Sequence, residues 1–108
     1  MKKVHESELA ANRVFGESGY VDLIDAVVGE VTAGVRVVAP NSNVPPRSHS
    51  HCEGQVIYVI SGRPRITNLT ETIRLRPGDF VILGAFEEHY IQTDDSESKI
   101  FEVKFPTT

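Results

Sequence analysis

Cysteine and long apolar runs are scarce in this chain. Its 108 residues contain one cysteine, Cys52. A single cysteine excludes an internal disulfide framework, and a cytoplasmic location is expected. No apolar stretch approaches the length of a membrane span, and the opening residues, MKKVHESELAANR, carry two lysines with no apolar run behind them. We therefore expect neither a membrane segment nor a secretory signal.

Concentrated positive charge is absent as well. The net charge is −4 and no basic block occurs, so a nucleic-acid partner is not expected. Hydrophobic residues make up 40% of the chain and charged residues 24%, as in a folded globular protein. The length predicts one domain over residues 1–108, with its core at residues 20–105.

A sustained helical period is also missing, apart from a short helical turn near residues 7–11. Glycines and prolines divide the rest into short runs rich in Val, Ile, Phe and Tyr. The predicted strands span residues 20–28, 30–39, 47–51, 56–60, 65–69, 72–75, 80–83, 89–93 and 99–105. Many short strands between turn residues predict an all-β sandwich or barrel.

Histidines and one glutamine carry the candidate metal chemistry. Side chains alternate across a strand, so His49 and His51 share a face, and Gln55 lies at an even spacing from both. Imidazole suits Zn, Cu, Fe and Ni, and an amide oxygen suits the harder of these metals. His89 begins a late strand that a barrel can place beside the pair, whereas His5 lies in the loose N-terminal segment. A pair of exposed histidines on a strand edge, without metal, is the alternative.

The spacing of these residues resembles the two motifs of the cupin superfamily. HSH, Gln55 and Gly62 resemble the first motif, and Gly78, Asp79 and His89 in RPGDFVILGAFEEH resemble the second. The resemblance implies an all-β double-stranded β-helix, the cupin or jelly-roll barrel of two packed antiparallel sheets. It also implies a homodimer, because small single-domain cupins commonly pair through their outer sheets.

The same resemblance implies a ligand set, with departures. His49, His51, Gln55 and His89 would bind a divalent metal, Zn, Ni, Mn or Fe, near one mouth of the barrel. Gln55 stands where the family usually has Glu, and the turn before His89 lacks the usual Pro and Gly. Neutral imidazoles and a neutral amide leave the full charge on the metal, which favours an anionic ligand. Gln55 also cannot act as a base.

Two further charged residues are candidates for the substrate pocket. Arg36 lies within the apolar run GVRVVA, where an inward guanidinium could hold a carboxylate. Glu102 lies in IFEVKF and shares a face with Lys104, although parity alone does not tell which face is inward. Arg63 and Arg65 are expected on the surface. No catalytic residue is assigned.

Alternation also yields expectations for the remaining neighbours of the site. Tyr58, at an odd spacing from Gln55, should face away from it, and Cys52 is expected as a small buried or half-buried residue. The candidate apolar residues of the pocket wall are Val37, Ile57, Val59, Ile91 and Phe101.

Three functions fit this pattern. The first is a metal-dependent enzyme acting on a small anionic substrate, a sugar acid or a keto/enol acid, by Lewis-acid chemistry of the isomerase or lyase type. The second is a non-haem iron dioxygenase, whose activity would need oxygen. The third is a non-catalytic ligand-binding or sensor cupin, which needs no placed acid or base.

Overall fold

The structure is a computed structural model that describes residues 1–49 and 52–107, with the side chains of residues 46–49 outside the description. A short 3-10 turn, η1, precedes the strands and spans Glu6–Glu8. The strands are β1 (Asn12–Phe15), β2 (Tyr20–Val27), β3 (Thr32–Val38), β4 (Asn43–His49), β5 (Gly54–Ser61), β6 (Arg65–Thr67), β7 (Thr72–Arg74), β8 (Phe80–Leu83), β9 (His89–Gln92) and β10 (Ser98–Phe105).

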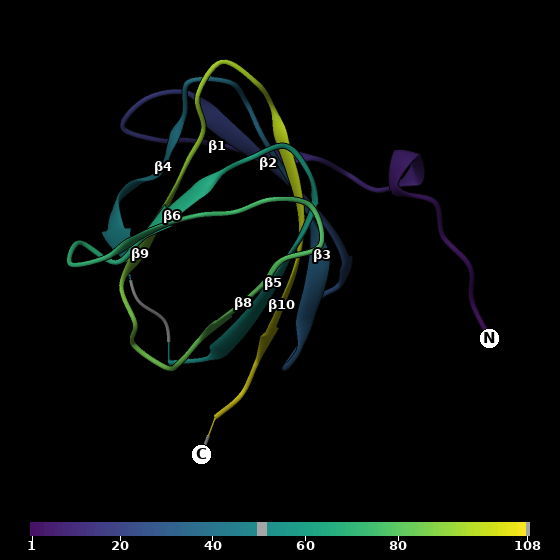
Figure 1. The fold of residues 1–108 in the computed structure, drawn as a ribbon. Helices are drawn as coiled ribbons and strands as arrows, with labels where there is room; N and C mark the ends of the chain where they lie inside the picture. The colour runs from purple at the N-terminus through teal and green to yellow at the C-terminus, as the bar shows by residue number, and fades with distance from the viewer. Residues whose placement is uncertain (50–51, 108) are drawn as a thin grey trace.

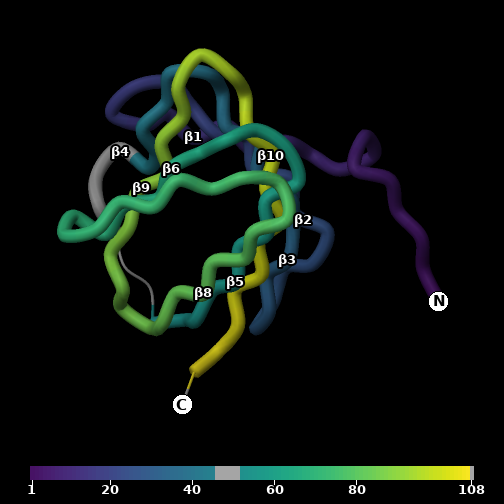
Figure 2. The backbone as a smooth tube through the Cα atoms, in the orientation of Figure 1, coloured from purple at the N-terminus to yellow at the C-terminus, as the bar shows by residue number. Residues whose placement is uncertain are grey.

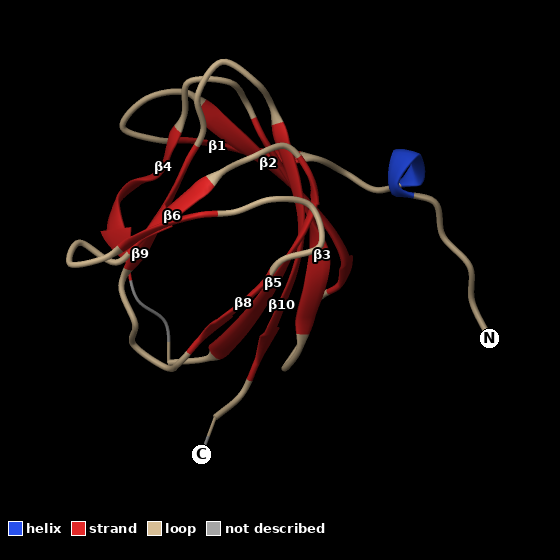
Figure 3. Cartoon of the chain, viewed as in Figure 1, coloured by secondary structure: helices blue, strands red, loops and turns tan. Residues whose placement is uncertain are grey.

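The strands form two sheets that close into a barrel (Figures 1 and 3). The six-stranded sheet has the order β1-β2-β3-β10-β5-β8, and the four-stranded sheet has the order β4-β9-β6-β7. Neighbouring strands in both sheets are antiparallel. The predicted all-β double-stranded β-helix is therefore confirmed. No helix among the described residues is long and apolar enough to cross a membrane.

Alternation of side chains gives the six-stranded sheet one buried face. On β5, Gln55, Ile57 and Val59 are buried, and Val56 and Tyr58 between them are only partly so. The same alternation on β3 and β10 buries Arg36, Val38, Ile100 and Glu102. Polar side chains at three of these positions thus lie on the inner face, a placement that needs partners inside the barrel.

Two apolar clusters fill the barrel. The larger comprises Ile57, Val59, Ile66, Leu75, Leu83 and Ile100, and the smaller comprises Val21, Val38 and Val44. Ile57, Val59 and Ile100 are each at most 1% exposed. Full burial of one such side chain stabilises a fold by about 1.5–3 kcal/mol, so these residues fix how the two sheets pack.

The N-terminal region departs from the prediction. Residues 12–15 form β1, which pairs with β2, so the sheet begins before the predicted core at residue 20. The helical turn lies at Glu6–Glu8 rather than near residues 7–11, on a segment that extends away from the barrel (Figure 2). The strand predicted over residues 47–51 is instead β4, Asn43–His49, and residues 50–51 lie outside the description.

Candidate metal and ligand site

A cavity of about 140 Å³ lies inside the barrel. Its polar lining residues are Arg36, Gln55, His89, Glu102 and Lys104. Its apolar lining residues are Val14, Val21, Leu23, Val38, Val44, Pro45 and Ile91. An apolar pocket with a few convergent polar groups is the usual form of a small-molecule site.

Adjacent strands bring the polar residues of one wall together. Arg36 is on β3, Glu102 on β10 and Gln55 on β5, three strands that neighbour one another in the six-stranded sheet. In the register of β10 with β5, Lys104 stands opposite Gln55 and Glu102 opposite Ile57. The Gln55 and Glu102 side chains are therefore diagonal neighbours on the inner face, within reach of each other.

His89 borders the same cavity from the four-stranded sheet. It begins β9, and its side chain is 3% exposed. Its Nδ1 lies 3.1 Å from the backbone carbonyl oxygen of Glu87. A carbonyl oxygen only accepts, so Nδ1 carries the proton, and in the neutral ring Nε2 bears the lone pair. Metal-binding histidines are commonly oriented in this way by a carbonyl on their other nitrogen.

The backbone of His49 lies beside His89. β4 pairs with β9 in an antiparallel ladder in which the Cα atoms of His49 and His89 are partners. The first and second motifs thus meet in space at this point. The side chain of His49 and the whole of His51 lie outside the described residues. Within the part of the chain that is described, no three His, Cys, Asp or Glu side chains gather as a metal site.

A network of charged groups links the polar side chains of the wall. The Glu102 carboxylate accepts from Arg36 Nε at 3.2 Å and from Gln55 Nε2 at 3.1 Å, with Lys104 Nζ 3.9 Å away. Arg36 NH1 donates to Asp25 Oδ1 at 2.6 Å. Arg36 and Glu102 are 5% and 6% exposed, so this pairing offsets the cost of burying their charges. The formal charges of Asp25, Arg36, Glu102 and Lys104 sum to zero.

The sequence did not predict two members of this network, Asp25 and Lys104. Asp25 lies three residues after Asp22, so alternation cannot place both on one face. The register of β2 against β3 shifts just after Asp25, which stands opposite Gly34. Any side chain at position 34 would collide with Asp25, so the glycine leaves room for the Asp25–Arg36 pair. Lys104 could have been assigned to the site from its parity with Glu102.

Among the other residues near the site, one prediction is confirmed and three are wrong. Tyr58 faces away from Gln55, as predicted, and its ring lies 4.7 Å from that of Phe80. Val37 and Phe101 do not line the described cavity, because each neighbours an inward residue on its strand and so faces outward. The free thiol of Cys52 is exposed rather than buried.

Ile57 and Val59 are buried in the larger core cluster and do not border the cavity. Ile91 does border it. The predicted wall is therefore correct for one of its five members.

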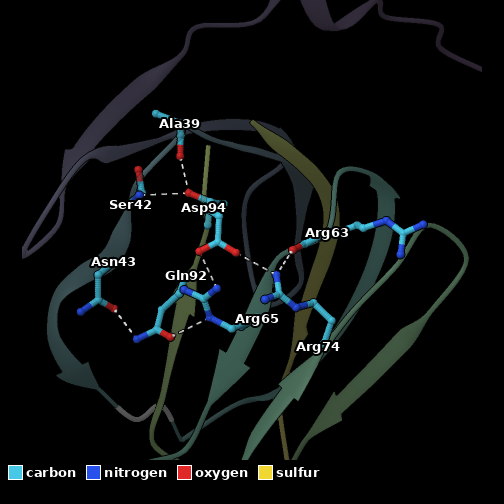
Figure 4. A network of polar contacts seen from close by, with 9 residues as sticks. Ala39, Ser42, Asn43, Arg63, Arg65, Arg74, Gln92 and Asp94 are labelled. Carbon is cyan, nitrogen blue, oxygen red and sulfur yellow. Dashed lines mark hydrogen bonds and ion pairs between the residues drawn. The ribbon is translucent and has the colours of Figure 1, made fainter. Parts of the chain in front are cut away.

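A second polar network lies on the four-stranded sheet (Figure 4). Asn43, Gln92, Arg65 and Arg74 occupy one row across β4, β9, β6 and β7. Asp94 accepts from Arg65 NH1 at 2.6 Å and from Arg74 NH1 at 3.1 Å. Both hydrogen bonds lower the pKa of Asp94 below its ordinary value, and the bond from Arg65 has the larger effect. Arg65 therefore has a surface role in the sheet, as predicted.

A family model supports the sequence resemblance. The model described as "Cupin domain" matches residues 34–103, well over half of the chain. The matched region includes β5, β9 and most of β3 and β10, the strands that carry Gln55, His89, Arg36 and Glu102. No curated protein sequence matches this chain.

Solved structures share the fold at low sequence identity. A predicted oxalate decarboxylase from Thermotoga maritima has a TM-score of 0.87 at 17% identity, over 98% of this chain and 100% of that one. The polyketide cyclase RemF from Streptomyces resistomycificus has a TM-score of 0.77 at 21% identity, over 96% and 78%. The Clostridium difficile EutQ protein has a TM-score of 0.74 at 17% identity, over 97% and 81%. These likenesses show the fold alone.

Proposed function

The chain belongs to the cupin domain family, and on that premise we propose that residues 1–108 form one metal-binding cupin whose site takes a small anionic ligand. The observation that carries the proposal is the meeting of both motifs, in which the backbone of His49 faces that of His89. Gln55, another of the four predicted ligands, borders the same cavity as His89.

His49, His51, Gln55 and His89 are the residues that would hold the metal, which is Zn, Ni, Mn or Fe. The orientation of His89 fits such a role, because a neutral ring that donates from Nδ1 to the Glu87 carbonyl has its lone pair on Nε2. The donor set of imidazole nitrogens and an amide oxygen suits these metals. When bound, the metal supplies a Lewis acid that polarises a carbonyl or enolate oxygen.

An anionic ligand follows from the charges around the cavity. The proposed ligands are neutral, and the charges of Asp25, Arg36, Glu102 and Lys104 cancel. The charge of the metal is therefore left for the ligand to balance. The carboxylate of a sugar acid or a keto/enol acid would do so. Lys104 suits contact with it, because Lys104 borders the cavity and its ion pair with Glu102 is long, at 3.9 Å.

Isomerase or lyase-type chemistry on such a substrate is the activity we propose. A non-catalytic binding module is the second candidate, and Glu102 favours it. Both oxygens of this carboxylate accept hydrogen bonds from the wall, so it is held in place rather than presented as a base. Turnover without oxygen, with Zn or Ni bound, would distinguish the proposed activity from an iron dioxygenase and from a binding module.

Metal content of the purified protein tests the site. The parent, expressed with ample metal and without chelator, should carry near-stoichiometric metal by mass spectrometry. The His49→Ala/His89→Ala variant should carry none, and His5→Ala, a control in the exposed N-terminal segment, should match the parent. A parent that stays empty, or a double variant that retains full metal, would refute the proposal.

We also propose that two copies pair through the outer face of the six-stranded sheet. Val35, Phe101, Tyr58 and Phe80 form one row across β3, β10, β5 and β8 on that face. Phe80 and Ile82 on the edge strand β8 are 67% and 75% exposed. This row of uncharged, largely apolar side chains can complement itself, which is what a two-fold homodimer requires.

A further inference from the structure

The contact between Gln55 and Glu102 assigns a role to a carboxylate that is not one of the predicted metal ligands. We propose that Glu102 is a positioning residue that fixes which end of the Gln55 amide faces the metal. The Gln55 Nε2 donates to Glu102 Oε2 at 3.1 Å, and both side chains are buried. The inference rests on the proposed metal site, because the orientation matters only if Gln55 is a ligand.

The chemistry of the two groups sets the orientation of the amide. Glu102 pairs with Arg36 Nε at 3.2 Å and lies 3.9 Å from Lys104 Nζ, and a carboxylate only accepts hydrogen bonds. Only the NH₂ end of Gln55 can bind such a partner. The carbonyl oxygen is then turned away from Glu102, and it is the end of an amide that a divalent cation accepts. With a neutral partner at position 102, either end of the amide could face the cavity.

Glu102 is itself fixed by a relay that crosses four adjacent strands. Asp25 on β2 binds Arg36 on β3, Arg36 binds Glu102 on β10, and Glu102 binds Gln55 on β5. Arg36 NH1 lies 3.3 Å from the carbonyl of Val35, which further limits its movement. Groups that are buried and mutually bonded keep one arrangement, so the amide has a single orientation.

The same contact explains why position 55 holds glutamine. A glutamate there would place a second carboxylate against Glu102, and two carboxylates sharing a buried site repel each other. The chain has one negative charge at this pair of positions, and it lies on Glu102 rather than on the predicted ligand. Exchanging the two residues should keep the hydrogen bond and move the charge to position 55.

Thermal unfolding of the chelator-treated protein tests the contact without metal. At pH 8, Gln55→Glu should lower the unfolding temperature by about 5 °C or more. Gln55→Glu/Glu102→Gln should recover most of that loss, because the amide and the carboxylate then face each other again. Additive losses in the double variant, or a Gln55→Glu variant as stable as the parent, would overturn the inference.

Metal affinity tests the positioning role. In competition with a chelator, Glu102→Gln should bind Zn²⁺ about 10-fold or more weakly, as expected when an outer partner of a ligand is lost. The exchanged double variant should bind at least as tightly as the parent. Glu30→Gln, which removes an exposed carboxylate, is the matched control and should not change the affinity.

The outcomes separate the inference from the proposed function. A parent that binds no metal overturns the proposed function and the inference together. A parent that binds Zn²⁺, with a folded Glu102→Gln variant of equal affinity, overturns the inference alone. A tight-binding double variant beside a weak Glu102→Gln variant supports both.

Discussion

His49 on β4 and His89 on β9 are partners in one antiparallel ladder, although forty residues of sequence separate them. The four-stranded sheet thus joins the two motifs on which the metal prediction depends. The opposite wall contributes Gln55 from the six-stranded sheet. A metal between these positions would bridge the two sheets, so its binding should be linked to the stability of the whole barrel.

Zinc should raise the unfolding temperature if this bridge forms. At a free Zn²⁺ concentration 100-fold above the dissociation constant, binding to the folded state alone adds about 2.7 kcal/mol. We expect a clear upward shift for the parent and none for His89→Ala by scanning fluorimetry. Equal shifts in both proteins would place the binding elsewhere on the chain.

Replacement of Gly34 by alanine should destabilise the fold. A side chain there would meet the backbone of Ile24 and the side chain of Asp25. Overpacking of this kind costs about 1–3 kcal/mol, and it would also displace Asp25 from Arg36. Gly29→Ala is the control, because no atom lies near its added carbon. Denaturant unfolding of the two variants should differ clearly, and equal stability would contradict the packing described here.

Lys104 should govern affinity for anions and change metal affinity far less, because its ion pair with Glu102 is long, at 3.9 Å. In the zinc-loaded protein, Lys104→Met should weaken binding of pyruvate, a small keto acid, by about 10-fold, the loss expected for one charged hydrogen bond. Isothermal titration calorimetry measures both affinities. Lys99→Met is the control, since Lys99 pairs with Glu6 and does not line the cavity. Unchanged pyruvate binding in Lys104→Met would remove this residue from the site.

Acid should destabilise the chain partly through Asp94. The hydrogen bonds from Arg65 and Arg74 lower the pKa of Asp94 in the folded state. Its contribution is then present above about pH 4, the region where an unfolded aspartate ionises, and is lost as the pH falls further. Asp94→Asn should show a shallower fall of unfolding temperature between neutral and acid pH. Asp95→Asn, an exposed neighbour, should keep the slope of the parent.

The proposed homodimer should depend on the apolar edge of β8. Ile82→Lys places a charge on a side chain that is 75% exposed in one copy, so the fold should survive while the pairing is lost. Sedimentation velocity should give a dimer for the parent and a monomer for the variant. Val28→Lys alters an equally exposed valine outside the strands and should remain dimeric. A monomeric parent would refute the proposal.

Alternation made much of the barrel predictable. The runs that contain Arg36, Gln55 and Glu102 change side with every residue, so their strands and the outward position of Tyr58 follow from the sequence. The Pro-Gly turn before β8 is local as well, with the amide of Arg76 donating to the Asp79 carboxylate and Gly78 at positive φ. Such features depend on local chemistry.

The features that were missed depend on distant pairing. The four residues of β1 are too few to indicate a strand, and they form one by pairing with β2. Asp25 shares the inner face of β2 with Val21 and Leu23 and reaches Arg36 because the β2–β3 pairing places it opposite Gly34, diagonal to Arg36. Parity left the inner face of β10 undecided, and it was the pairing with β3 and β5 that turned Glu102 inward and Phe101 outward. The metal, the substrate and the cytoplasmic location stay predictions.

A crystal structure of the zinc-loaded protein, with anomalous data collected at the zinc absorption edge, tests the central claim most directly. We predict one strong peak within bonding distance of ring nitrogens of His49, His51 and His89 and of the Gln55 carbonyl oxygen. The Gln55 Nε2 should still donate to Glu102. A peak away from His49 and His89, or a Gln55 amide whose nitrogen faces the metal, would contradict the account.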